Sequence, residues 1–239
     1  MIEMGKNSIV ISLARIASLT LAATVASSCS HATESSQQAG SSTSRSTVPT
    51  SVSYPPLRSE WDVSGALTGN AKDFAQFAAE TRADQYEFLN ADSYSADLMN
   101  RYNARVDAAD KTSRDAWQDW HTGVPVTGGL LMRAVDSTPT ENGQRITVCE
   151  FNTPGVFDIV DGKLKLDSNK RVFGSGTMTV SSTTQPSAAD SHASQTPRLL
   201  VISLKFGEDQ DAAKRCEQAM PDPFTQTTPS PTAVTSQPK

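Results

Sequence analysis

The stretch DAWQDWHTG, residues 115–123, holds the side chains best suited to chemistry. They are Asp115, Trp117, Asp119, Trp120 and His121. On a helix the two tryptophans would share a face and could stack on sugars, and the histidine beside a carboxylate could transfer protons. The alternative is structural: the tryptophans fill the core between a helix and the sheet, and the histidine lies near the helix C-terminus, where a cation favours the dipole. We favour the structural interpretation.

No other stretch predicts catalysis. His31 and His192 fall in segments expected to be disordered, so His121 is the histidine on which an enzyme would depend. The sequence has no nucleophile elbow, phosphate-binding loop, dinucleotide fingerprint or zinc motif. Gly-Ser-Gly at 174–176 is typical of a bulge or close bend in a strand. The aspartates at 158, 161 and 167 lack calcium-loop spacing and are expected in turns. We therefore predict no cofactor or metal, and a non-enzymatic protein.

Cys29 ends an N-terminal segment with the order of a secretory signal. Lys6 and Arg15 come first, an apolar run at 16–26 follows, and small residues precede the thiol. The apolar run is shorter than the roughly 20 residues that a membrane-spanning helix needs. An ordinary signal peptide cleaved near Ala26 is the alternative, in which Cys29 would have no special role.

The pentapeptide Val-Ala-Ser-Ser-Cys, residues 25–29, resembles the tolerant form of a bacterial lipoprotein signal. Ala26 stands where leucine is usual, and Ser28 stands where glycine or alanine is usual. The resemblance implies that residues 1–28 are removed and that Cys29 is acylated as the new N-terminus. Several acyl chains would hold the protein on the outer face of the cell membrane.

Two segments flank the predicted folded domain at 54–222. Residues 29–53 are rich in Ser, Thr and Gln and nearly free of large apolar side chains, so burial cannot offset their ordering entropy. We expect a flexible tether there. Residues 223–239, with their Thr- and Pro-rich stretch from Thr225, are expected to form a disordered tail.

Cys149 and Cys216 remain once Cys29 is acylated. In an exported chain such a pair favours a disulfide. Cys149 lies in an apolar run and Cys216 in a helical pattern, so the bridge would join a C-terminal helix to a sheet. A buried pair of free thiols is the alternative, and neither cysteine has a second metal ligand at zinc spacing.

The domain divides into helices first and strands afterwards. Helical patterns cover 71–90 with Asn70 as N-cap, then 91–110 with Ser93 or Ser95 near its start, and then 112–123. The expected strands are rich in β-branched or aromatic residues and cover 130–135, 145–151, 156–160, 171–181 and 198–206. Residues 183–197 are expected to be a disordered insertion. This order predicts an α+β fold with an antiparallel sheet.

The strand patterns GQRITVCEFNTPGVFDIVDG, RVFGSGTMTV and RLLVISLKFGEDQDAAKRC resemble NTF2-like domains of actinobacterial lipoproteins, although the tryptophan common in the last strands is missing. The resemblance covers residues 70–220. It implies N-terminal helices packed on a curved antiparallel sheet, in a cone-shaped arrangement, and a cysteine pair between an early strand and the C-terminus.

Composition limits the partners. The chain has 239 residues, 37% hydrophobic and 20% charged, and a formal net charge of -5. That balance argues against nucleic acid, whose binding requires clustered cations. We expect a lipid-anchored, extracytoplasmic envelope protein that binds a small molecule or an envelope protein. The alternatives are an enzyme that uses His121 with Asp119 or Asp115 in the same cavity, and a purely structural envelope protein.

Overall fold

The computed structural model describes residues 51–91, 93–108, 124–207 and 209–234. These residues belong to one compact unit, Val48–Lys239. The expected signal peptide, the tether up to residue 50 and the expected helix at 112–123 lie outside them. None of the described helices has the length and apolar character needed to cross a membrane.

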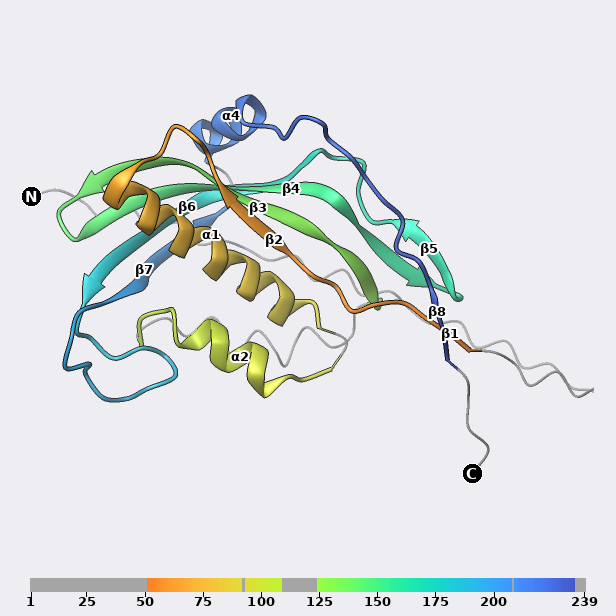
Figure 1. The fold of residues 1–239 in the computed structure, drawn as a ribbon, viewed down its shortest axis with the longest axis horizontal. Coiled ribbons are helices and arrows are strands. Elements are labelled where there is room, and N and C mark those ends of the chain that lie inside the picture. The colour runs from red at the N-terminus through yellow and green to blue at the C-terminus, as the bar shows by residue number, and fades with distance from the viewer. Residues whose placement is uncertain (1–50, 92, 109–123, 208, 235–239) are drawn as a thin grey trace, which may run out of the picture. The chain divides into compact units, whose positions relative to one another are not determined.

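A mixed sheet of six strands forms the centre of the unit (Figure 1). Its order is β2-β3-β4-β6-β7, and β5 pairs with β4. The strands are β2 (Glu60–Val63), β3 (Val126–Thr140), β4 (Gly143–Val160), β5 (Lys163–Leu166), β6 (Val172–Thr183) and β7 (Arg198–Phe206). Helices α1 (Gly69–Leu89) and α2 (Ala96–Asn103) lie on one side of the sheet, and α4 (Gln210–Gln218) lies on the other. The α+β prediction is confirmed.

The predicted sheet was wrong in one respect, because β2 pairs in parallel with β3. Glu60 lies opposite Leu131 and Val63 opposite Ala134. Parallel neighbours need a long crossover, which α1 and α2 help to supply between these two strands. The sequence analysis did not predict β2, because four residues are too few to show the alternation of apolar and polar side chains that marks a strand. All other pairings in this sheet are antiparallel.

The first described helix begins at a different residue from the predicted one, whereas Ser95, one of the two predicted starts of the second, is its N-cap. Helix α1 has Thr68 as its N-cap, in place of Asn70. Helix α2 begins after Ser95, whose Oγ accepts a hydrogen bond from the Leu98 N–H at 3.3 Å. It ends at Asn103, seven residues before the predicted end, because the next residues pair with the edge of β7: the Asp107 N–H donates to the Val201 carbonyl at 2.9 Å.

Residues 183–197 were expected to be disordered, and the structure corrects that expectation. The Ala188 N–H donates to the Val106 carbonyl at 2.9 Å, and the Ala189 N–H donates to the Asn103 carbonyl at 3.1 Å. Ser187 is 1% exposed. Backbone groups that pair with the chain beyond α2 give this segment the order that its polar composition does not predict.

The described part of the expected tail is ordered too. The Thr227 N–H donates to the Pro154 carbonyl at 2.7 Å, and Thr153 Oγ1 donates to the Thr225 carbonyl at 2.6 Å. Farther along, β8 (Thr232–Val234) pairs with β1 (Ser51–Ser53), at the end of the expected tether. Hydrogen bonds to β4 and β1 therefore organise residues 225–234, although few of their side chains are apolar.

The main core lies between α1 and the sheet. Its α1 side includes Ala75, Ala78 and Ala79, none of which is exposed. Side chains this small let the helix approach the strands closely. The fully buried strand residues that face it include Leu130, Met132, Ala134, Ile146, Val148, Met178 and Val180.

The other side of the sheet carries α4 and the disulfide. Cys149 in β4 and Cys216 in α4 are bonded, and both are fully buried beside Phe151. The predicted bridge between a C-terminal helix and the sheet is confirmed. Arg133 adds a second tie, since its Nη1 donates to the Ala219 carbonyl at the end of α4 at 3.0 Å.

We expect Cys149→Ala/Cys216→Ala to lower the free energy of unfolding by about 4 kcal/mol. The two cysteines are 67 residues apart, and the bridge restricts the unfolded chain by an amount that grows with that separation. Urea unfolding followed by circular dichroism checks this value. Unchanged stability in the double variant would contradict a structural role for the bridge.

Candidate functional site

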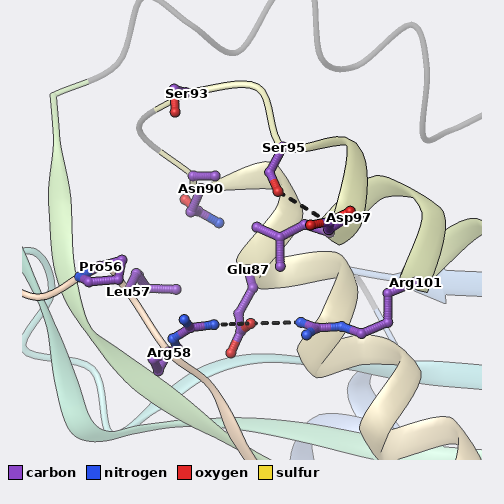
Figure 2. A pocket seen from close by; sticks show the side chains of 11 residues that line it. Pro56, Leu57, Arg58, Glu87, Asn90, Ser93, Ser95, Asp97 and Arg101 are labelled. Atoms are coloured by element: carbon purple, nitrogen blue, oxygen red, sulfur yellow. Dashed lines mark hydrogen bonds and ion pairs between the residues drawn. The ribbon is translucent and has the colours of Figure 1, made fainter.

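A pocket of about 440 Å³ opens between the segment before β2, the C-terminal end of α1 and the N-terminal half of α2 (Figure 2). Polar and apolar side chains line it together: Pro56, Leu57, Arg58, Glu87, Asn90, Ala91, Ser93, Ser95, Asp97, Leu98 and Arg101. Its volume is within the range of small-molecule sites, which combine an apolar lining with a few oriented polar groups.

Glu87 organises this pocket. The Glu87 side chain is 8% exposed and lies between the guanidinium groups of Arg58 and Arg101 (Figure 2). Its Oε2 accepts from Arg101 Nη2 at 2.8 Å and from Arg58 Nη1 at 3.4 Å, and its Oε1 accepts from the Ser59 N–H at 2.8 Å. One carboxylate therefore holds together the entry to β2, the end of α1 and the last turn of α2.

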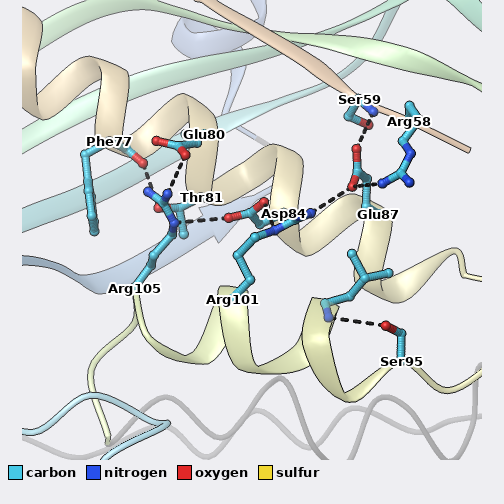
Figure 3. Close-up of polar contacts among 11 residues, drawn as sticks. Arg58, Ser59, Phe77, Glu80, Thr81, Asp84, Glu87, Ser95, Arg101 and Arg105 are labelled. Atoms are coloured by element: carbon cyan, nitrogen blue, oxygen red, sulfur yellow. Dashed lines mark hydrogen bonds and ion pairs between the residues drawn. The ribbon is translucent and has the colours of Figure 1, made fainter.

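The same pattern continues along the two helices as a row of alternating charges (Figure 3). Glu80, Asp84 and Glu87 recur at three- and four-residue spacing on α1 and so share one face. Arg101 on α2 and Arg105 just beyond it lie opposite. Arg101 Nε is 2.6 Å from Asp84 Oδ1, Arg105 Nε is 3.1 Å from Asp84 Oδ2, and Arg105 also pairs with Glu80.

Asp84 is the buried carboxylate in the middle of this row. Burial raises the pKa of its carboxyl above the ordinary 3.8, against the attraction of Arg101 and Arg105, while Glu80 and Glu87 raise it further. Burial is the largest of these influences, and together with the two neighbouring acids it prevails over the two arginines. Asp84 Oδ2 lies near Arg105 but has no partner with hydrogen-bond geometry.

A second buried ion pair lies where α1 faces the sheet. Arg82 Nε donates to Glu150 Oε1 of β4 at 2.6 Å, and the guanidinium lies 4.0 Å from the centre of the Phe206 ring. A Cβ at Gly174 would overlap the Glu150 carboxylate, so a larger residue there would displace this carboxylate. The register of β4 and β6 shifts at Phe173, one residue before the Gly-Ser-Gly stretch for which a bulge or close bend was predicted, and residues 174–176 pair regularly with β4.

Tyr86 lies one turn farther along α1, in edge contact with Phe173. Burial raises the pKa of its hydroxyl well above the ordinary 10.0, and the charges of Glu150 and Asp167 act in the same direction. Tyr86 therefore stays protonated at neutral pH.

These charges suit binding better than proton transfer. The buried carboxylates of Asp84, Glu87 and Glu150 each pair with an arginine, which opposes their use as general bases. A guanidinium has five N–H donors, and Arg58 contacts Glu87 through Nη1 only. The remaining donors of Arg58, whose side chain is 66% exposed, are placed to bind oxygen atoms of a ligand.

Only some of the predicted site residues are among those that the structure describes. Cys149 and Cys216 are brought together, whereas Cys29 and all five candidates in residues 115–121 lie outside the described residues. In the described part of the chain, no cluster of three His, Cys, Asp or Glu side chains could hold a metal. Asp161 is in the predicted turn, at a φ of 50°.

Sequence reasoning missed the pocket residues. The signal was present, because acidic residues at helical spacing in α1 and the Arg101–Arg105 pair four residues apart predict facing charged rows. The sequence does not show that these two charged rows face each other. No family model, curated protein or solved structure was found to match the chain.

The raised pKa of Asp84 makes its contribution depend on pH. Protonated Asp84 is favoured in the folded state, so its contribution is fully present below the unfolded value of 3.8 and is lost as pH rises through the higher folded value. We expect Asp84→Asn to gain stability relative to the wild type between pH 4 and pH 7. Urea unfolding at both values measures the difference.

Asp73→Asn is the matched control, because Asp73 is exposed on the same helix and forms no ion pair within the described residues. A difference for Asp84→Asn that stays constant or falls over this pH range would show that the ion pairs outweigh burial.

Proposed function

We propose that the protein is a lipid-anchored component of the bacterial cell envelope whose α+β domain binds a small polar molecule without catalysing a reaction. The pocket beside Glu87 is the observation that carries this proposal. Its floor is fixed by a carboxylate that three donors hold, and its rim presents guanidinium, hydroxyl and amide groups. A carboxylate held by three donors, with further polar groups around it, favours ligand recognition.

The anchor rests on the sequence around Cys29. A cationic start, an apolar run and small residues before a thiol are the features that a lipoprotein signal requires. The disulfide between Cys149 and Cys216 supports an extracytoplasmic location, because such bonds persist in oxidising compartments. An NTF2-like arrangement is part of the proposal, and two helices on one face of a multi-stranded sheet support it.

We expect Cys29→Ala to move the protein from the membrane fraction to the soluble fraction. Acyl chains on this sulfur supply the membrane affinity, and the substitution removes their attachment point. Fractionation followed by immunoblotting measures the distribution, and intact mass of the wild type should exceed that of the polypeptide from Cys29 by the acyl groups. Ser28→Ala is the control and should stay in the membrane, since small residues are tolerated there. Membrane retention of Cys29→Ala would refute the anchor.

We expect Arg58→Gln to weaken binding of a polar ligand at the pocket by about tenfold, the effect of losing one charge-assisted hydrogen bond. A screen of small polar metabolites, read from the backbone amide shifts of Ala91, Ser95 and Leu98, identifies the ligand and its affinity. Arg58 is largely exposed, so its replacement leaves the core intact.

Arg58→Lys separates charge from geometry, because lysine keeps the charge but not the planar donor array. Lys72→Gln removes an equal charge from the exposed start of α1 and is the control. A screen in which no compound shifts the pocket amides would refute the binding function, as would binding that both Arg58 variants leave unchanged.

A further inference from the structure

A second depression, of about 290 Å³, lies on the sheet face that carries α4. It is formed by β4, β6, β7 and the N-cap residue of α4. Its lining is almost entirely polar and consists of Arg145, Thr177, Thr179, Ser203, Lys205 and Asp209. The pocket beside Glu87 shares none of these residues.

Strand register explains why these side chains meet. Arg145, Thr179 and Ser203 lie in one row across β4, β6 and β7. Lys205 lies opposite Thr177 in the neighbouring row. Because side chains alternate along a strand, and the intervening residues Met178 and Leu204 contact the core on the α1 side, both rows face the α4 side. Side chains in adjacent rows are close enough to share one ligand.

Among the residues that the structure describes, the two cations of this depression have no acidic partner. Arg145 and Lys205 are exposed, and neither forms an ion pair with any residue that the structure describes. Asp209, the acidic residue of the lining, accepts hydrogen bonds from the Asp211 and Ala212 N–H groups at 3.0 Å each. The lining therefore has a net charge of +1, from two cations and one carboxylate committed to capping α4.

Three hydroxyl groups lie beside the cations, two of them in β6 between β4 and β7 and the third in β7. Thr177, Thr179 and Ser203 are partly buried, and none has a side-chain hydrogen bond within the described residues. Each hydroxyl can donate one hydrogen bond. Two cations beside three hydroxyl donors match a tetrahedral oxyanion, whose oxygens accept from several directions.

We propose that this depression binds a phosphate-type oxyanion, with Arg145 and Lys205 supplying charge and the three hydroxyls supplying direction. The site is independent of the pocket beside Glu87. Two sources share the required chemistry, namely free inorganic phosphate and the phosphodiester of an anionic lipid headgroup.

The test uses the full chain in neutral detergent micelles. Inorganic phosphate is titrated at constant ionic strength, and the backbone amide shifts of Thr177, Thr179 and Ser203 are followed. We expect saturable shifts confined to this face. Arg145→Gln/Lys205→Gln should weaken binding by at least about tenfold, since it removes both charge-assisted contacts. A second titration replaces free phosphate with phosphatidylglycerol doped into the micelles, with phosphatidylcholine as the neutral comparison.

Lys163→Gln/Lys170→Gln is the matched control, because it removes two exposed cations elsewhere on the domain, Lys163 being in β5 beside the far end of β4. Binding of free phosphate, or of phosphatidylglycerol alone, supports the oxyanion site and identifies its source. Shifts that do not saturate with either probe would overturn the proposal, as would equal weakening by the control pair, which would indicate general charge attraction.

Discussion

The packing of α1 against the sheet is the constraint on which the other features depend. Ala75, Ala78 and Ala79 are fully buried, so the backbone of the helix lies close to the strands and its rotation is set. With that rotation, Arg82 points toward Glu150, and Asp84 and Glu87 point toward α2. A bulkier residue in place of an alanine would displace both charged faces together.

The charged row between α1 and α2 shows what ion pairs contribute here. Burial is the largest influence on the Asp84 carboxyl and raises its pKa although two arginines attract its charge, so the folded state favours the protonated form. The value of the row lies in position: Arg101 and Arg105 interleave with the acidic side chains that recur along one face of α1. Arg101 is thereby held beside Glu87, where the pocket needs it. The row thus holds together two of the segments that line the pocket beside Glu87.

The two faces of the sheet serve different purposes. The α1 side holds the main core, while the α4 side holds the smaller cluster around the disulfide. Because α4 covers only part of its face, the rows through Arg145 and Lys205 stay open to solvent beyond its N-terminus. The bond at Cys216 and the Arg133 contact to Ala219 keep α4 in that place.

Local patterns in the sequence determined the elements whose signals are local. Strand β7 was predicted with its observed bounds, and the bridge between Cys149 and Cys216 followed from composition and compartment. Only the tertiary structure decided the rest. It joined 145–151 and 156–160 into one strand, paired β2 in parallel and ordered residues 183–197 through backbone hydrogen bonds. Pockets depend on such pairings, because distant segments supply their walls and spacing along the chain does not record which segments meet.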